Sequence, residues 1–287
     1  NSTELFCVID DFFLKFEATY WKFLKQIRHS LRIRTAQLTI SEISFIAIWY
    51  KCSHFSNFKA FFTWLTEDKS HLFKSLPCYQ RMIHLINMHQ LALQALHVAL
   101  MKGQYKQYLW IDSTTLPVCK NQRIQRHKSL VRIASRGKSS MGWFYGCKLH
   151  IAMNQFGEIA CSALSNGHIA DIKMVEHLVE GLEAKLYADR GYISQDLKSR
   201  LKDQGIDLIT YHRKNMRTVQ LCAQDEYHLK QRNKIETLFS LLKGQYNLVT
   251  SKARSIRGFL SGIYASLCAY QLTHRNKPTI QIMESVA

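Results

Sequence analysis

Apolar and polar positions follow two different patterns along the chain, and the change comes near residue 104. Before it, apolar residues such as Phe12, Phe16 and Tyr20 recur every three or four positions, which is the period of amphipathic helices. After it, short apolar runs separated by polar turns predict strands. The pattern therefore predicts an all-α region over residues 1–104 and a mixed α/β region over residues 105–287.

The second region has the strand pattern of a single mixed sheet. Three strands come first, with a hairpin turn at residues 154–157, and helices and strands then alternate. The predicted strands cover residues 107–117, with an end near Asp112, and residues 144–153, 159–164, 186–189 and 206–211. Three antiparallel strands followed by alternating helices and strands predict a ribonuclease H-like sheet flanked by helices.

Composition narrows the class of partner. The net charge is +18, and the simplest physical reason for such an excess is a polyanion, with DNA or RNA ahead of membrane headgroups. The longest apolar run, residues 259–272, is too short to span a bilayer, so we expect no membrane segment. The eight cysteines form no Cys-x-x-Cys pair, which argues against a zinc ribbon or a disulfide framework and favours the cytoplasm.

Part of the positive charge lies between the first two predicted strands. Residues 119–142 contain no acid and form a basic insertion. A solvated loop is the plain interpretation, but a neighbouring acidic site makes contact with a phosphate backbone the better one. The expected DNA contacts here are Lys120, Arg123, Arg126, Lys128, Arg132, Arg136 and Lys138.

Three carboxylates are candidates for chemistry. Asp112 follows the apolar run 108–111, Asp189 ends the fourth strand, and Glu236 lies on a helix predicted over residues 232–243. A charged residue in an apolar strand is costly to bury unless it is paired or binds a metal. Oxygen donors without a Cys or His cluster favour Mg²⁺ or Mn²⁺ over Zn²⁺. Two such ions would catalyse in-line phosphoryl transfer, so we expect a metal-dependent activity.

The helix that carries Glu236 also carries cations on the same face. Arg232, Glu236, Ser240 and Lys243 fall at offsets that form one polar stripe. On its own, this stripe is an ordinary solvated face with an i,i+4 ion pair. Beside the two aspartates, Arg232 and Lys243 become candidates to hold DNA phosphates.

These residues together resemble the catalytic domain of bacterial DDE transposases over residues 105–272, most nearly the family named after insertion sequence 982. The matching segments are Ile111-Asp112-Ser113, Tyr187-Ala188-Asp189-Arg190-Gly191-Tyr192, and Arg232, Glu236 and Lys243 of the motif Tyr-x2-Arg-x3-Glu-x6-Lys. The tyrosine of that motif is replaced by Leu229, and the nearest tyrosine is Tyr227.

The resemblance implies a function and partners. A member of this family binds the inverted-repeat ends of its own element, hydrolyses DNA to free 3′-OH ends and joins them to target DNA. It implies Asp112, Asp189 and Glu236 as the catalytic and metal-binding residues, with two Mg²⁺ ions for which Mn²⁺ can substitute. It also implies double-stranded DNA as the partner, a homodimer or larger assembly, a location at the bacterial nucleoid, and DNA binding by residues 1–104.

Two alternatives stay open. The same fold serves structure-selective nucleases that cut without joining, and a DNA-binding relic would keep the acids without activity. Trp110 and Trp143 could stack on a displaced base, but core packing or a strand-end anchor is the simpler interpretation of both.

Overall fold

The computed structural model describes residues 2–27, 37–101, 107–211, 220–248 and 253–274, and these fall into two compact units. Among the described residues, one unit is helical and lies within residues 2–100 and 242–274, and the other is α/β and lies within residues 101–241. The division falls within one helix, between Leu241 and Leu242. The predicted boundary at residues 104 and 105 lies outside the described residues.

The helical unit begins as the periodicity predicts. Its helices are α1 (Ser2–Ile27), α2 (Ile40–Cys52), α3 (Phe58–Asp68), α4 (Tyr79–Met88), α5 (Gln90–Met101) and α10 (Ile256–Thr273), with the short 3-10 helix η1 (Ser70–Leu72). Thr39 and Glu42 form a capping box that starts α2, and the Asn57 side chain accepts a hydrogen bond from Ala60 N–H at the start of α3.

Helix α10 groups with the N-terminal helices, although the sequence pattern assigned residues 105–287 to one region. Its Ser261 hydroxyl donates to the carbonyl of Ile86 at 3.2 Å, and it packs against α2 and α4. Apolar and small residues occupy most of its circumference, and a helix that is apolar all round must be covered on several sides. Tertiary contacts therefore group α10 with the N-terminal helices, although it follows the α/β region in the sequence.

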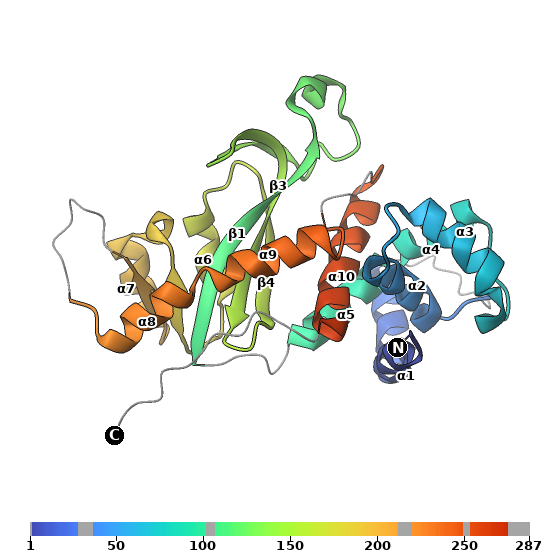
Figure 1. Ribbon diagram of the computed structural model, residues 1–287, viewed down its shortest axis with the longest axis horizontal. Helices are drawn as coiled ribbons and strands as arrows, with labels where there is room; N and C mark the ends of the chain where they lie inside the picture. The colour runs from blue at the N-terminus through green and yellow to red at the C-terminus, as the bar shows by residue number, and fades with distance from the viewer. Residues whose placement is uncertain (1, 28–36, 102–106, 212–219, 249–252, 275–287) are drawn as a thin grey trace. The chain divides into compact units, whose positions relative to one another are not determined.

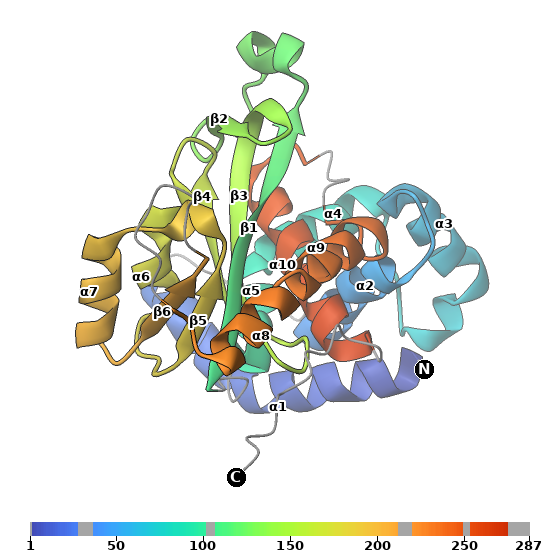
Figure 2. The same ribbon diagram turned by 60° about the vertical axis from the view of Figure 1, so that its left-hand side comes forward.

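The α/β unit contains one six-stranded sheet. Its elements in chain order are β1 (Tyr108–Cys119), η2 (Asn121–Arg126), β2 (Ser135–Ser139), β3 (Gly142–Asn154), β4 (Ile159–Asn166), η3 (Asp171–Met174), α6 (Val175–Leu178), β5 (Lys185–Ala188), η4 (Arg190–Tyr192), α7 (Gln195–Asp203), β6 (Asp207–Thr210), α8 (Ala223–Gln231) and α9 (Lys234–Gly244). Figures 1 and 2 show the long strands β1 and β3 side by side.

The strand order confirms the predicted ribonuclease H-like architecture. The strand β3 pairs antiparallel with both β1 and β4, whereas β5 pairs parallel with β1 and with β6. The order β4-β3-β1-β5-β6 therefore follows from three antiparallel strands and two crossovers. The extra strand β2 pairs with the beginning of β3, along Gly142–Gly146.

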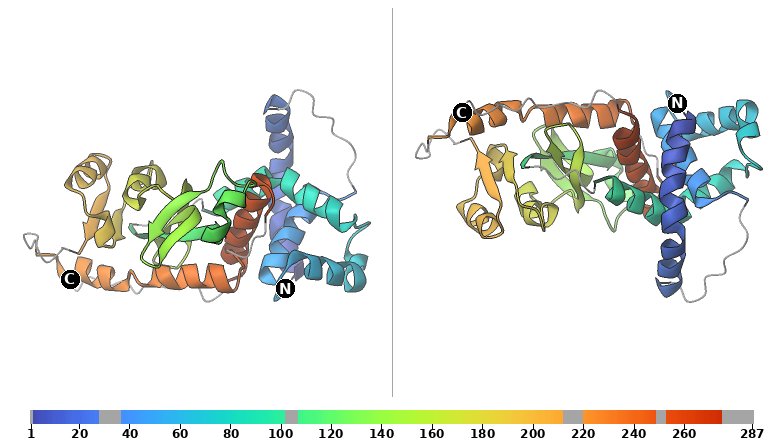
Figure 3. Two further views of the ribbon diagram at one scale, coloured as in Figure 1. Left: turned by 90° about the horizontal axis from the view of Figure 1, so that it is seen from above. Right: turned by 90° about the horizontal axis from the view of Figure 1, so that it is seen from below.

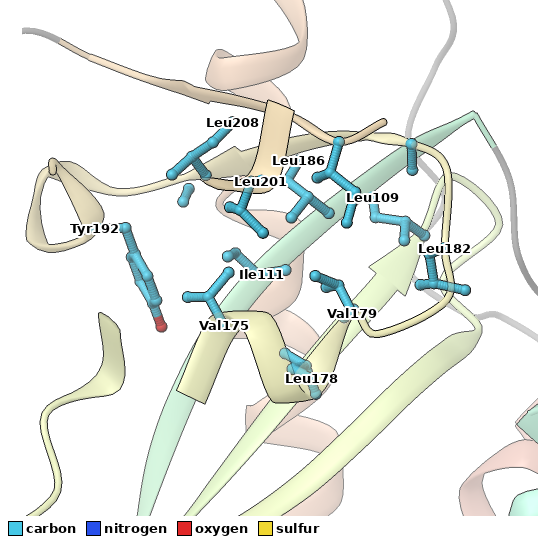
Figure 4. Packing of buried hydrophobic residues seen from close by; sticks show 14 of the residues in the cluster. Leu109, Ile111, Val175, Leu178, Val179, Leu182, Leu186, Tyr192, Leu201 and Leu208 are labelled. Carbon is cyan, nitrogen blue, oxygen red and sulfur yellow. The ribbon is translucent and has the colours of Figure 1, made fainter. Parts of the chain in front are cut away.

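Helices cover both faces of this sheet (Figure 3). On one face α6 and α7 enclose a core of aliphatic side chains from β1, β5 and β6 (Figure 4). Leu109, Ile111 and Leu186 are at most 1% exposed, and Tyr192 closes the end of the same cluster. The opposite face carries α8 and the first part of α9, with Trp110 buried beneath.

Three local details differ from the sequence predictions. The first strand does not end near Asp112 but continues to Cys119, because residues 113–119 find partners on β3. The basic insertion is not a simple loop, since η2 and β2 lie within it. The helix predicted over residues 232–243 is interrupted at its start, with α8 ending at Gln231 and α9 beginning at Lys234.

Candidate active site

Asp112 lies in the middle of β1, opposite Ile151 of β3. Its side chain is 22% exposed and faces the side of the sheet where α8 and α9 lie. One carboxylate oxygen accepts the backbone N–H of Ser113 at 2.8 Å. The other lies 3.3 Å from Nη1 of Arg232. The carboxylate therefore has two partners, and both favour its charged form.

Asp189 directly follows β5, the strand that pairs with β1 on its other edge. Its side chain accepts the backbone N–H of Gly191 at 2.8 Å and so caps the 3-10 helix η4. An added Cβ at Gly191 would lie 2.9 Å from the Asp189 carboxylate, so a side chain here would displace the carboxylate from the Gly191 N–H. The turn formed by residues 189–192 thus holds the Asp189 carboxylate in place at the end of β5.

Glu236 lies in the first turn of α9 and is exposed. Arg232 occupies the short break between α8 and α9, where its helical backbone angles keep the two helices nearly continuous. Arg232 and Glu236 therefore keep the helical i,i+4 spacing across the break, and Nη2 of Arg232 lies 3.4 Å from Oε1 of Glu236. The guanidinium accordingly lies between Asp112 and Glu236 and contacts both.

The three candidate carboxylates influence one another electrostatically. Burial raises the pKa of Asp112 to about 6, the Ser113 N–H and Arg232 counteract part of this rise, and the charges of Asp189 and Glu236 add to it. Asp189 follows the strand that pairs with β1, and Glu236 shares the Arg232 guanidinium with Asp112, so both acids lie close enough to influence Asp112 electrostatically. The structure therefore brings Asp112, Asp189 and Glu236 into one region of the α/β unit.

An aromatic stack beneath Asp112 fixes the helix that precedes Arg232. The Trp110 indole donates to the carbonyl of His228 on α8 at 2.8 Å, and its ring stacks on Tyr187 of β5 with centroids 5.6 Å apart. Asp225, also on α8, accepts hydrogen bonds from the Tyr187 hydroxyl at 2.9 Å and from Lys185 at 3.2 Å. Trp110 is therefore a core residue, as its apolar strand predicts, and not an exposed stacking platform.

Tyr192 is a site neighbour that the sequence pattern did not single out. Burial raises the pKa of its hydroxyl, and the charges of Asp112, Asp171 and Asp189 raise it further, whereas a hydrogen bond with the Ser113 side chain acts in the opposite direction. The hydroxyl therefore stays protonated near the carboxylates at neutral pH. Its position in the sequence could have indicated this role, because Tyr192 lies three residues after Asp189 in the segment that resembles the transposase motif.

The remaining residues predicted to bind DNA form no ion pair with the three acids in the part of the chain that the structure describes. Lys243 lies on α9 beyond Glu236, but it belongs to the helical unit, and burial lowers its pKa. The seven cations predicted to contact DNA are all exposed and lie on or beside η2 and β2, and no ion pair within the described residues involves them. These positive charges are thus left to solvent or to a partner.

The donor types around Asp112 fit a hard divalent cation, because they are carboxylate oxygens and carry mutually repelling charges. Within the described ranges, however, no three Asp, Glu, His or Cys side chains converge closely enough to hold a metal ion. The Arg232 guanidinium instead supplies the positive charge beside Asp112 and Glu236. Metal binding at this site would require the carboxylates to converge.

Comparison with known families agrees with this geometry. The family model described as the transposase DDE domain matches residues 102–256, which is more than half of the chain. The chain belongs to the transposase DDE domain family. All three candidate acids of this DDE domain, Asp112, Asp189 and Glu236, fall within the matched residues.

Two further comparisons complete the picture of this DDE family member. No curated protein matches it. Among solved structures, a cryo-EM structure of the piggyBac transposase synaptic complex with hairpin DNA is similar with a TM-score of 0.49 and 11% sequence identity, covering 84% of this chain and 68% of that chain. No helix among the residues that the structure describes has the length and apolar character needed to cross a membrane.

Proposed function

We propose that this DDE family member is a DNA transposase that binds the ends of its own insertion sequence, cleaves DNA to expose 3′-OH ends and joins them to target DNA. The observation that carries the proposal is the grouping of Asp112, Asp189 and Glu236 around β1 and β5, in a chain that matches the transposase DDE domain. The proposal extends to a bacterial element like insertion sequence 982 and to action in the cytoplasm at the nucleoid.

The three carboxylates are proposed to hold two Mg²⁺ ions, for which Mn²⁺ would substitute. When bound, these ions would activate the attacking oxygen and stabilise the leaving one. Within the chain, the Ser113 N–H orients Asp112 and Gly191 orients Asp189. Arg232 is proposed to hold a DNA phosphate beside the carboxylates, and Lys243 to hold a second phosphate.

Double-stranded DNA is the proposed partner over a wide surface. The exposed cations of residues 119–142 support contact with the phosphate backbone, because they have no acidic partners in the described structure. Residues 1–104 are proposed to bind the element ends. Here Lys51 is not a contact residue, since it is buried, donates to the carbonyl of Asn247 at 2.9 Å and has its pKa lowered to about 8 by burial. Because two ends must be processed together, a homodimer or larger assembly is proposed.

The deciding experiment is a strand-cleavage and joining assay on labelled duplexes that carry the DNA flanking this gene, with Mg²⁺ or Mn²⁺. Wild-type protein is expected to release 3′ ends and form joined products, and Asp112→Asn and Asp189→Asn are each expected to lose at least about a thousandfold in rate. Asp207→Asn serves as the matched control, because Asp207 is an exposed carboxylate on the neighbouring strand β6.

The outcomes separate the alternatives. Cleavage without joining would assign a nuclease instead of a transposase. Tight binding without cleavage under either metal would assign a DNA-binding relic. Undiminished turnover by Asp112→Asn would show that the site assignment is wrong.

A further inference from the structure

The turn between β2 and β3 presents an apolar tip to solvent. Ser139 pairs with Gly142, so Ser140 and Met141 form the connection, and Gly142 has a φ of 110°, which favours glycine. The Ser139 hydroxyl accepts the Met141 N–H at 3.3 Å and donates to the Gly142 carbonyl at 3.2 Å. The Met141 side chain on this braced turn is 96% exposed.

Trp143 lies beside this tip and is 54% exposed, so of the two interpretations from sequence core packing is wrong for it. Its position is the second residue of β3, which is a strand end. It stands opposite Lys138 in the β2–β3 register, with the Lys138 ammonium 5.9 Å from the ring centroid. The Arg136 guanidinium lies 4.8 Å from the same centroid. Cation–π contacts of this kind hold the indole in place, while about half of the side chain stays exposed.

The hairpin is held firmly at its base. An added Cβ at Gly137 would meet the carbonyl oxygen of Gly167 at 2.1 Å, so β2 approaches that backbone closely. The Ser135 hydroxyl accepts the backbone N–H of His168 at 2.9 Å. On the other side, the Asn121 amide donates to the Trp143 carbonyl at 2.8 Å and ties η2 to the hairpin. Figure 2 shows β2 and η2 together at the far end of the long strands.

An exposed indole and thioether among cations fit a nucleic-acid base rather than another apolar surface. A protein partner would have to cover Arg136 and Lys138, whereas a nucleic acid supplies phosphates for these cations and a flat ring for Trp143. We propose that Met141 and Trp143 form a stacking platform for an unpaired DNA base. This inference rests on the proposed DNA function and adds to it a preference for unpaired or distorted DNA.

The platform lies away from the candidate carboxylates. Trp143 is eight residues along β3 from Ile151, the partner of Asp112, which corresponds to roughly 25 Å at about 3.3 Å per residue. At about 3.4 Å per base step, that length equals roughly seven steps of duplex. The platform would therefore act on DNA beyond the reacting phosphate, and a probe must extend well past the cleavage site.

The test uses the full chain and two duplexes of about 40 base pairs, which exceeds that span. One duplex has a two-nucleotide bulge of 2-aminopurine, and the other has the same 2-aminopurines fully paired. Wild-type protein is expected to prefer the bulged duplex and to quench its fluorescence. Trp143→Ala is expected to bind the bulged duplex about tenfold more weakly and to lose the quenching, with little change on the paired duplex.

Two further variants make the result decisive. Trp143→Phe keeps an aromatic ring and is expected to retain most of the preference and the quenching. Phe156→Ala removes another exposed aromatic, at the β3–β4 turn, and is expected to change neither. Equal weakening on both duplexes, or no weakening by Trp143→Ala, would overturn the platform while leaving DNA binding intact. Failure of the wild-type protein to bind either duplex would overturn the proposed function as well.

Discussion

The guanidinium of Arg232 lies 3.3 Å from the carboxylate of Asp112, although the two residues are 120 positions apart in the chain. The same guanidinium contacts Glu236 at 3.4 Å. With side chains 18% and 22% exposed, Arg232 and Asp112 form one of the more enclosed ion pairs of the described structure. Arg232 therefore compensates charge in a group of acids that would otherwise repel one another.

Removing this compensation should destabilise the metal-free protein. At pH 7.5 we expect Arg232→Gln to lower the free energy of unfolding by about 1–3 kcal/mol, because it leaves Asp112 partly buried and without its cation. The control is Arg200→Gln, since the Arg200 side chain is 46% exposed and its partners Glu176 and Asp196 are 35% and 80% exposed. That change should cost much less, because solvent screens exposed ion pairs. Equal losses in urea denaturation would show that Arg232 is an ordinary surface cation.

The raised pKa of Asp112 makes stability depend on pH. Its folded pKa of about 6 exceeds the ordinary value of 3.8, so the folded state binds this proton more tightly. The tighter binding of this proton stabilises the folded state fully below about pH 4, and this stabilisation is lost as the pH rises through 6. Above pH 6 the ionised carboxylate costs up to about 3 kcal/mol.

An amide at this position cannot ionise. Metal-free Asp112→Asn should therefore be more stable than wild type at pH 7.5, by up to about 3 kcal/mol, and the difference should shrink toward zero as pH falls to 4. Denaturant unfolding at several pH values measures this, with Asp207→Asn as the exposed control. A difference that is constant with pH would show that Asp112 does not titrate as its surroundings indicate.

Divalent cations should stabilise the wild-type protein through the same acids. At a free Mg²⁺ concentration ten times the dissociation constant, binding contributes about 1.4 kcal/mol, or roughly 3 °C in the unfolding temperature. Asp112→Asn should lose most of this shift. Calorimetry with Mg²⁺, Mn²⁺ or a chelator tests the site without any DNA present, and an undiminished shift in the variant would place the bound ions elsewhere.

Trp110→Phe should loosen α8 beneath Arg232. The change removes the indole N–H that donates to the His228 carbonyl, in a position with no exposure. An unsatisfied buried carbonyl and a small cavity together should cost about 2–4 kcal/mol of unfolding free energy. If thermal unfolding shifts by less than a degree, the hydrogen bond is not what anchors α8 to β1.

The basic insertion should govern the salt dependence of DNA binding. Replacing Arg123, Arg126 and Arg132 by Gln removes up to three phosphate contacts, so the slope of log K against log salt should become shallower by up to about 2.7. Exchange of three exposed cations outside the proposed DNA contacts, Lys173, Lys198 and Lys202, gives a matched control. An unchanged slope in the insertion variant would exclude phosphate contact at these arginines.

The order of the sheet could be predicted from sequence, because strand and helix periodicities are local properties and few topologies fit their order. The three acids could be predicted as well, since charges at apolar strands and helix stripes are conspicuous in sequence. The family match over residues 102–256 agrees with their placement, while their catalytic role stays a prediction. The exposure of individual side chains was harder to predict from the sequence, as Trp110 and Trp143 show. Both adjoin apolar strand residues, yet Trp110 has no exposure and Trp143 is 54% exposed.

The local pattern of residues by itself determined the two kinds of secondary structure, the acidic candidates and the basic insertion. Only the tertiary structure decided that α10 joins the N-terminal helices, that β1 runs on to Cys119, and that Arg232 contacts Asp112. The physical reason is the same in each case. Burial of apolar surface and pairing of charges depend on which distant segments come into contact. Periodicity along the chain indicates which face of an element is apolar, but it does not indicate which other element packs against that face.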